Sequence, residues 1–522
     1  MGKTLSDEGE GYLERSARGA VILLIGRLVS TALSAATVIL IARLIGSRDY
    51  GYVAMAMIPL SIANLLSNPG VSAGLTRYIA HYRATGRDGD IPILLKAGLS
   101  VNALLSLLLT LLLYLLSPQL SMLFHAPPIQ GLLRLASLYV AVNTLLLTAQ
   151  AAFTGFERME LYSLTSIVYS ILRFALSIIL ILLGLGAMGA MTGNVAATAL
   201  AALLGLLLLL PHLRSSPGAS MREREAISLL LAYGFPLFIS SLLTVGLNQL
   251  YNLLLASHVE ASVVGNYQAA VNFSALLSLL TTPIITTLFP LFSQLDRGEL
   301  REAFQTSVKY TALLLTPLTL FLIALSEEVV SIVYGRNYSL ASGYLALYLV
   351  NFLFIGLGGL SVANLLNGQG ETRVVFQIRL INLLLGLPMG FILIPRLGVV
   401  GLLITLIAAP RLGLFYGLYW IWRRYGFTLD VGSSAKIYLS SLAAFLLVEF
   451  LLGALGLEDW VSLLLGGLLY LILYVLLTAS LRTLDEGDFR NLRRMSRALG
   501  PLSPLIDPLI SLVEALSKRF GL

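Results

Sequence analysis

The chain has 522 residues, of which 57% are hydrophobic and only 12% are charged, and its mean hydropathy is +0.87. This composition excludes a soluble globular protein and is typical of a chain that crosses a membrane many times. It contains no cysteine and only four histidines, so we expect no disulfide, no metal site and no cofactor. The net charge of +7 does not indicate nucleic-acid binding, because the basic residues flank apolar segments.

Fourteen apolar segments are long enough to cross a bilayer, which takes about 20 residues each. In chain order these segments are Ala20–Ala42, Tyr52–Leu75, Ile91–Leu116, Leu132–Phe153, Leu161–Leu183, Gly189–Leu210, Ile227–Ala256, Val263–Leu288, Tyr310–Val333, Tyr344–Leu366, Val374–Ile394, Gly398–Trp420, Ile437–Leu455 and Val461–Leu481. The predicted fold is therefore an all-α integral membrane protein with fourteen transmembrane helices.

Basic residues are concentrated in alternate loops. One set of loops carries Lys3, Arg15, Arg18, Arg83, Arg87, Arg158, Arg214, Arg222, Arg224, Arg297, Arg301, Arg373, Arg423, Arg424 and Lys436. The opposite set carries little beyond Arg43, Arg48, Arg134, Arg336 and Arg396. Because cytoplasmic loops are enriched in Lys and Arg, we expect a multi-pass protein of the cell (plasma) membrane with both termini in the cytoplasm.

The first half of the chain is repeated in the second half. Gly51 and Gly265 are 214 positions apart, as are Pro69 and Pro283, and a similar turn recurs from Gly186 to Gly398. Spans one to six therefore pair with spans seven to twelve. Each half has an even number of spans, so the copies share one topology and form a parallel repeat. Two such halves with broken helices are typical of a transporter whose substrate binds between them.

The repeat sets the predicted domain boundaries. These are an N-terminal lobe (1–211), a cytoplasmic linker (212–226), a C-terminal lobe (227–424), two extra spans (425–481) and a basic amphipathic tail (482–522). In the tail, Phe489–Leu499 has a helical composition, and Asp507 and Pro508 are suited to start a second helix. The tail is either an interfacial helix on the inner leaflet or a poorly ordered segment.

Short motifs at the ends of several spans suggest a family. They are Ala42–Gly46 followed by Asp49–Tyr52, then Tyr233–Leu237, Val264–Ala269 and Leu397–Gly401. In these motifs the chain resembles the polysaccharide and O-antigen flippases of the MOP exporter superfamily, which also contains the MATE drug exporters and the lipid II flippases.

The resemblance implies a flippase that moves a polyprenyl-(pyro)phosphate-linked oligosaccharide from the inner to the outer leaflet. It implies alternating access of the two lobes around a central cationic cavity. We expect membrane lipids as the other partners and a protein that functions as a monomer. Coupling to Na⁺ or H⁺ is in doubt, because Tyr251 stands near the place where relatives often carry an acidic residue.

Several polar residues within the spans are candidates for binding this cargo. They are Arg173, Arg411, Arg27, Arg379, Arg77, Asn248 and Asn272. Arg173 lies about 12 residues into its span, or about 18 Å, and Arg411 follows Pro410 near the middle of its span. Arginine suits phosphate because its planar guanidinium donates two hydrogen bonds at once.

Each candidate also has a structural interpretation. Arg173 and Arg411 could pair with helix-end carbonyls or with a carboxylate such as Glu449, and the asparagines could bond neighbouring helices. Arg27 and Arg379 could extend to the inner interface, and Arg77 is interfacial by its position.

Two other functions are compatible with parts of the pattern. One is a MATE-type secondary exporter of drugs or metabolites, which would need a carboxylate within a lobe. The other is a membrane-embedded glycosyltransferase or polymerase. The chain lacks the nucleotide-binding loops, metal motifs and large loops of such enzymes, so we expect it not to be an enzyme.

Overall fold

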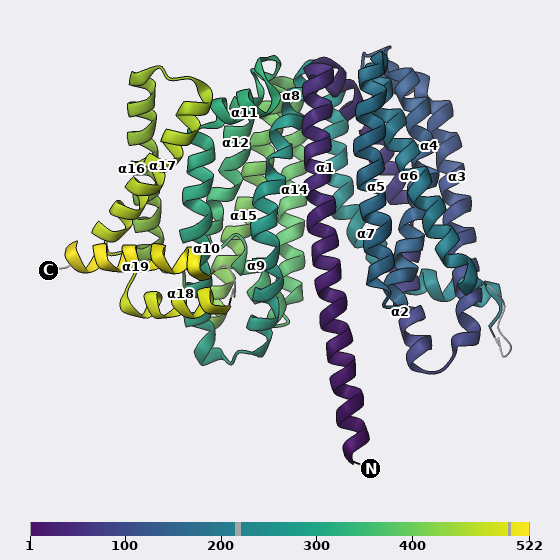
Figure 1. The fold of residues 1–522 in the computed structure, drawn as a ribbon, viewed down its shortest axis with the longest axis horizontal. Coiled ribbons are helices and arrows are strands. Elements are labelled where there is room, and N and C mark those ends of the chain that lie inside the picture. Colours follow the sequence, from purple (N-terminus) through teal and green to yellow (C-terminus); the bar gives the residue numbers. More distant parts are fainter. Residues whose placement is uncertain (1, 214–220, 499–502, 521–522) are drawn as a thin grey trace. The chain divides into compact units, whose positions relative to one another are not determined.

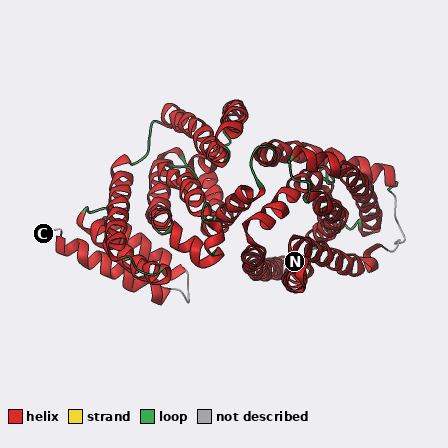
Figure 2. Cartoon of the chain, turned by 90° about the horizontal axis from the view of Figure 1, so that it is seen from above, coloured by secondary structure: helices red, strands yellow, loops and turns green. Residues whose placement is uncertain are grey.

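The computed structural model describes residues 2–213, 221–498 and 503–520 (Figure 1). Helices account for nearly all of them, and no strand occurs within those ranges (Figure 2). The described part of the chain contains ten helices that are long and apolar enough to cross a membrane, or eleven when one bent pair is included. The all-helical, multi-pass membrane fold is thereby confirmed, whereas the number of fourteen spans stays a prediction.

The helices form two compact units, unit 1 (Met1–Gln268) and unit 2 (Ala269–Leu522). The helices of unit 1 are α1 (Gly2–Leu66), α2 (Val71–Ala84), α3 (Ile91–Leu123), α4 (Ile129–Gly155), α5 (Met159–Leu180), α6 (Gly186–Leu209), α7 (Glu223–Ala256) and most of α8 (Ala261–Asn272). Helices α3 to α6 pack closely on one another, and α1 lies against α5 and α4. Their core contains Met55, Leu60, Leu133 and Phe153, all fully buried.

The predicted second span is not one helix. Helix α1 ends at Leu66, and α2 begins at Val71. Pro69 lacks the N–H that would continue the helix, and the side chain of Asn68 accepts a hydrogen bond from the Ser72 N–H at 3.1 Å. The chain therefore breaks and restarts before the predicted end of this span.

Helix α7 and the start of α8 belong to unit 1 because glycines let them approach its helices closely. A Cβ atom on Gly51 would overlap the Ala261 carbonyl, and one on Gly265 would overlap the Ser47 carbonyl. Gly70 of the α1–α2 break meets the backbone of Gly234 in α7 in the same way. These contacts attach α7 and the start of α8 to unit 1, which ends at Gln268. The lobe boundaries and the linker at 212–226 stay a prediction.

Unit 2 contains the remaining helices. They are α9 (Ser274–Gln294), α10 (Arg297–Ala324), α11 (Ser326–Tyr334), α12 (Ala341–Leu353), α13 (Ser361–Gly368), α14 (Thr372–Leu397), α15 (Val399–Tyr425), α16 (Val431–Leu455), α17 (Asp459–Ser480), α18 (Glu486–Ala498) and α19 (Ser503–Phe520). Phe292, Phe304, Leu365 and Ile421 form part of the core between α9, α10, α13 and α15. The predicted span Tyr344–Leu366 is broken, because the chain bends by 47° between α12 and α13.

A corresponding turn in each unit supports the repeat. Gly186 begins α6 with φ 48° and ψ −129°, and Gly398 precedes α15 with φ 57° and ψ −129°. Each turn joins two helices that pack tightly against each other, α5 with α6 and α14 with α15. The two glycines predicted to correspond therefore share one unusual backbone conformation.

The C-terminal tail forms a pair of helices that packs on unit 2. Leu484, Phe489 and Ile510 form a small buried cluster against Leu313 of α10. Helix α18 covers the predicted helix, but α19 begins at Ser503 and contains Pro508, so the prediction that α19 starts at Asp507 was wrong. Pro504 is the second residue of α19, where an N–H has no helical partner and a proline is tolerated.

Candidate functional site

Arg173 lies on α5 within unit 1 and is half-buried. Its Nε is buried and makes no hydrogen bond. Tyr139 of α4 interacts with both Arg173 and Tyr169, and the Tyr169 hydroxyl donates a hydrogen bond to Asn194 Oδ1 of α6 at 3.1 Å. No ion pair within the described ranges includes Arg173, so the carboxylate partner considered from the sequence is not found there.

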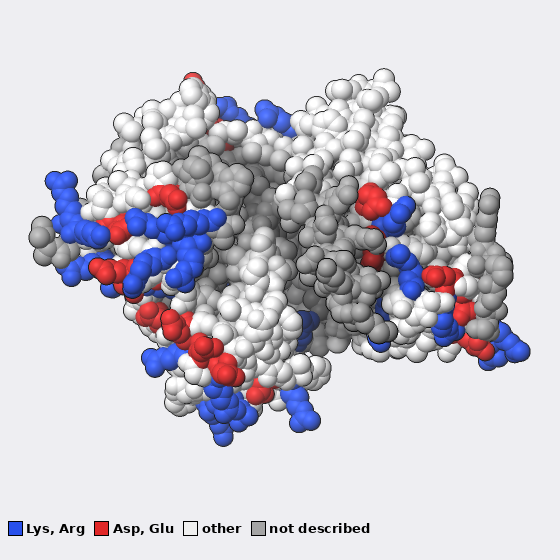
Figure 3. All heavy atoms as spheres, turned by 60° about the horizontal axis from the view of Figure 1, so that its bottom comes forward, with Lys and Arg blue, Asp and Glu red and all other residues white. Residues whose placement is uncertain are grey.

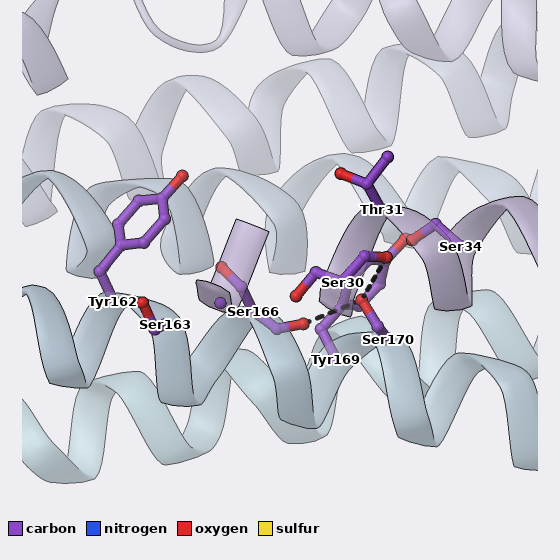
Figure 4. Close-up of a pocket in the computed structure, with 9 residues that line it drawn as sticks. Ser30, Thr31, Ser34, Tyr162, Ser163, Ser166, Tyr169 and Ser170 are labelled. Carbon is purple, nitrogen blue, oxygen red and sulfur yellow. Dashed lines mark hydrogen bonds between the residues drawn. The ribbon is translucent and has the colours of Figure 1, made fainter. Parts of the chain in front are cut away.

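A pocket lined by hydroxyl groups lies on the same side of α5 as Arg173. It has a volume of about 290 Å³ (Figure 4). Its lining residues are Gly26, Ser30, Thr31 and Ser34 of α1 with Tyr162, Ser163, Ser166, Tyr169 and Ser170 of α5. Arg173 follows Tyr169 by four residues and Ser170 by three, which places all three on one face of the helix.

The hydroxyl groups of this pocket retain hydrogen-bonding capacity. Ser170 Oγ donates to the Ser166 carbonyl at 3.0 Å and reaches the Ser30 carbonyl at 3.5 Å (Figure 4). Ser30 Oγ is buried and has no hydrogen-bond partner. Hydroxyls both donate and accept, so the pocket can bind a polyhydroxylated ligand. This pocket was not predicted from the sequence, although serines recur at helical spacing in two apolar spans.

Arg411 lies on α15 within unit 2 and has internal partners. Its Nη2 donates to Asn351 Oδ1 at 2.6 Å and to the Asn351 carbonyl at 3.2 Å. Its guanidinium carbon lies 3.8 Å from the ring centre of Phe354, a cation–π contact. Nε remains buried without a hydrogen bond. Arg411 thus has an amide and a carbonyl as partners and not Glu449, which is exposed on α16.

The other candidate residues are distributed over both units. The side chain of Arg27 lies outside the described residues. Arg77 is exposed at α2, where its guanidinium carbon lies 4.3 Å from the ring centre of Tyr233 in α7. Arg379 is exposed on α14, and Asn248 is exposed on α7. Asn272 ends α8 and donates weakly to the Tyr334 hydroxyl, at 3.4 Å.

In the structure, Arg77 therefore contacts α7 and Arg411 contacts α12, whereas Arg173 lies beside the hydroxyl pocket. Each of these contacts lies within one unit. Tyr251, the residue that put ion coupling in doubt, is only 4% exposed in α7. Nowhere in the described ranges do three His, Asp or Glu side chains gather as metal ligands would.

A family model described as polysaccharide biosynthesis protein matches residues 16–296, more than half of the chain. The chain belongs to the polysaccharide biosynthesis protein family. This confirms the resemblance drawn from the glycine, aromatic and proline motifs. The matched region covers unit 1 from residue 16 onward, with the hydroxyl pocket and Arg173, and extends through α9.

One similar protein is the probable low-salt glycan biosynthesis flippase Agl15 of Haloferax volcanii. It is 21% identical over 244 residues, which cover 45% of this chain and 50% of Agl15. The chain thus aligns with about half the length of this relative.

Solved structures support the fold over most of the chain. The lipid II flippase MurJ, in an inward closed conformation, matches with a TM-score of 0.69 at 17% identity, over 88% of this chain and 99% of MurJ. An inward-facing multidrug resistance MATE family transporter of the MOP superfamily matches with a TM-score of 0.59 at 16% identity, over 78% of this chain and 98% of the transporter. This member of the polysaccharide biosynthesis protein family therefore has the fold of these transporters.

Proposed function

We propose that the protein is a flippase for a polyprenyl-(pyro)phosphate-linked oligosaccharide. The observation that carries this proposal is Arg173, a half-buried guanidinium that lies next to a pocket of hydroxyl groups and forms no ion pair with any carboxylate of the described residues. Family membership and the similarity to Agl15 and MurJ support it. A charge within a membrane span is costly and is typical of a substrate pathway.

The chemistry of this arrangement suits the two parts of the cargo's headgroup. A guanidinium binds phosphate through paired, charge-assisted hydrogen bonds. Serine, threonine and tyrosine hydroxyls exchange hydrogen bonds with sugar hydroxyls without a fixed charge. Arg411, Arg27, Arg379, Arg77, Asn248 and Asn272 are proposed to contribute to the same pathway. An exporter of cationic drugs would need the opposite charge.

We place fourteen spans in the cell membrane, with both termini in the cytoplasm. Two of the long apolar stretches hold two spans each, since Leu28–Leu66 has non-helical backbone at Gly46 and Met159–Leu213 turns at Gly186. Helices α8 and α9 supply another span. Transport would proceed by alternating access of the two repeats in a single copy of the chain.

Energy coupling would not use a carboxylate at Tyr251, whose buried phenol stands in its place. The protein would carry out no covalent chemistry on its cargo. If a gradient of Na⁺ or H⁺ accelerates the crossing, another part of the chain couples transport to that ion. If the gradient leaves the rate unchanged, transport is not coupled to it.

The test is reconstitution of the purified protein in liposomes that hold a polyprenyl-pyrophosphate oligosaccharide in one leaflet. We expect the lipid-linked sugar to move to the other leaflet, and the R173Q/R411Q double variant to lose this movement while still inserting correctly. An R373Q variant, which changes an exposed arginine of α14, is the matched control. Gradient-driven export of a cationic dye without sugar movement would instead identify an exporter.

A further inference from the structure

A second and larger pocket lies within unit 1, away from Arg173. It has a volume of about 730 Å³, within the range of roughly 300 to 1,000 Å³ that is usual for small-molecule sites. Three segments build it: residues 48–52 of α1, the α3–α4 turn at 124–126, and the α7–α8 turn with the start of α8 at 257–262. In the proposed topology all three segments face the outside of the cell.

The polar side chains of the pocket include both donors and acceptors. Arg48 is exposed and donates from Nε to the Tyr52 hydroxyl at 3.1 Å, and it belongs to no ion pair of the described chain. Glu260 is exposed on the other side of the pocket and is near enough to Arg48 to interact with it. A guanidinium only donates hydrogen bonds and a carboxylate only accepts them.

His258 adds a ring nitrogen that can bind a hydroxyl group. Its Nδ1 lies 2.9 Å from the Leu254 carbonyl oxygen and 3.0 Å from Ser257 Oγ. Because the carbonyl can only accept, its contact favours the tautomer that has the proton on Nδ1 and leaves Nε2 as an acceptor. His125, on the α3–α4 turn, has φ 49° because it is the left-handed residue that ends α3: its N–H donates to the Met122 carbonyl, and the next N–H donates to the Ser121 carbonyl.

The apolar part of the pocket is aromatic. Tyr52 is half-buried and packs against the core, and Phe124 is buried behind the turn. Aromatic rings beside separate donors and acceptors suit a sugar, because a sugar ring has an apolar C–H face and hydroxyls that both donate and accept. They do not suit a phosphate, which only accepts hydrogen bonds and which the Glu260 carboxylate would repel.

We propose that this pocket is a carbohydrate-binding site, separate from the phosphate-binding residues. That its ligand is a sugar follows from the lining itself; that this sugar is the glycan of the transported lipid rests on the proposed function. Ala261 of α8 lines the pocket, and its backbone carbonyl also packs closely against Gly51 of α1. A bound sugar would therefore hold α1 and α8 together at their closest approach.

The chain has no cysteine, so one introduced thiol can report on the pocket alone. We would introduce S262C, at a residue that lines the pocket, and measure its rate of maleimide labelling in the full-length protein in nanodiscs. The probes are a panel of neutral and uronate-containing free oligosaccharides, with inorganic pyrophosphate as the phosphate-only probe. G131C, near the start of α4 with open space around its Cβ, is the control.

We expect at least one oligosaccharide to slow labelling of S262C about tenfold or more and to leave G131C unchanged. Adding R48Q or E260Q should each weaken this protection about tenfold, because each removes a charged hydrogen-bonding group. Because R48Q removes a positive charge and E260Q removes a negative one, a folding defect in one variant does not invalidate the result from the other. Protection by pyrophosphate alone, protection that survives both substitutions, or no protection by any sugar would overturn the proposal.

This assay needs no transport, so its outcome separates from that of the liposome test. Protection of S262C without movement of a lipid-linked sugar would keep the carbohydrate site and refute the flippase. Movement of the lipid without protection by any oligosaccharide would keep the flippase and refute the site.

Discussion

Gly51 and Gly265 each face the backbone carbonyl of the residue four positions before the other: Gly51 faces Ala261, and Gly265 faces Ser47. Gly51 corresponds to Gly265 and Ser47 corresponds to Ala261, each at an offset of 214 residues. The two contacts are therefore equivalent, and α1 and α8 cross about a local two-fold axis. Both partners are backbone atoms, which cannot rotate away as a side chain can. The crossing is therefore specific to glycine on both helices.

We expect G51A and G265A each to destabilise the protein by about 1–3 kcal/mol, the usual cost of overpacking a tight contact. The added methyl must separate α1 from α8. The measurement is the loss of monodisperse protein on heating in detergent. G131A is the control, since its methyl meets open space and alanine favours a helix. Equal stability of G51A and G131A would show that this crossing is looser than described.

Arg173 should act through its charge and its forked shape. We expect R173Q to slow flipping about ten- to a hundredfold, the effect of losing a charge-assisted contact, and R173K to restore only part of the rate. Initial rates of leaflet exchange at equal protein content measure this. A rate for R173Q equal to that of R373Q would remove Arg173 from the pathway.

Arg411 and Asn351 should be energetically coupled. Removing the amide in N351A leaves a half-buried guanidinium with fewer partners, so we expect N351A to destabilise unit 2 by about 1–3 kcal/mol. Most of that loss should disappear when R411Q is already present. A double-mutant cycle on chemical unfolding gives the coupling energy. Strict additivity of the two substitutions would mean that the hydrogen bond contributes nothing to stability.

One carboxylate supplies the ionic contact between the C-terminal helix pair and α10, beside the apolar cluster that includes Leu313. Asp488 pairs with Lys309 and accepts from the Tyr310 hydroxyl at 3.1 Å, and its Oδ2 accepts from the Asp485 N–H at 2.9 Å. We expect D488N to loosen α18 and α19, because it removes the charge in contact with Lys309 and leaves only the more distant Asp430 of the carboxylates known to interact with it. A spin label at S511C, exposed on α19, should then become mobile. In E486Q, which changes an exposed carboxylate of α18, the label should stay immobile.

Acid should loosen α19 from α18 through Glu514. The hydrogen bond from Lys518 holds the pKa of Glu514 below its usual value; burial acts in the opposite direction, and Arg493, at 2.5 Å, adds to the lowering. A lowered pKa stabilises the contact above pH 4.5, and this stability is lost as the pH falls through the shifted pKa. The label at S511C should gain mobility in that range. E514Q should show no such pH step.

The membrane class, the repeat and the family could all be predicted from the sequence, because hydropathy and glycine spacing express them directly. The breaks within spans could not. A proline such as Pro69 marks a place where a helix can break. Whether the helix does break there depends on a tertiary contact, the close packing of Gly70 on the backbone of Gly234. The assignment of α7 to unit 1 depends on the same close contacts.

The candidate site was predictable only in its charges. Deep arginines are visible in the sequence, since charges are rare in apolar spans. Whether such an arginine has a partner is not visible: Arg411 meets Asn351 from another helix, and Arg173 meets tyrosines. The hydroxyl pocket was missed because a serine in a span usually bonds its own helix.

The attachment of α18 to α10 also concerns the order in which the chain is made. Lys309 is synthesised about 180 residues before Asp488, and the paired side chains are only 12% and 9% exposed. Until α18 has been made, the contact with Asp488 cannot form, and Lys309 has the more distant Asp430 as a nearby charge. The packing of α18 on α10 therefore belongs to a late stage of folding, after the apolar helices that precede it in the chain have been synthesised.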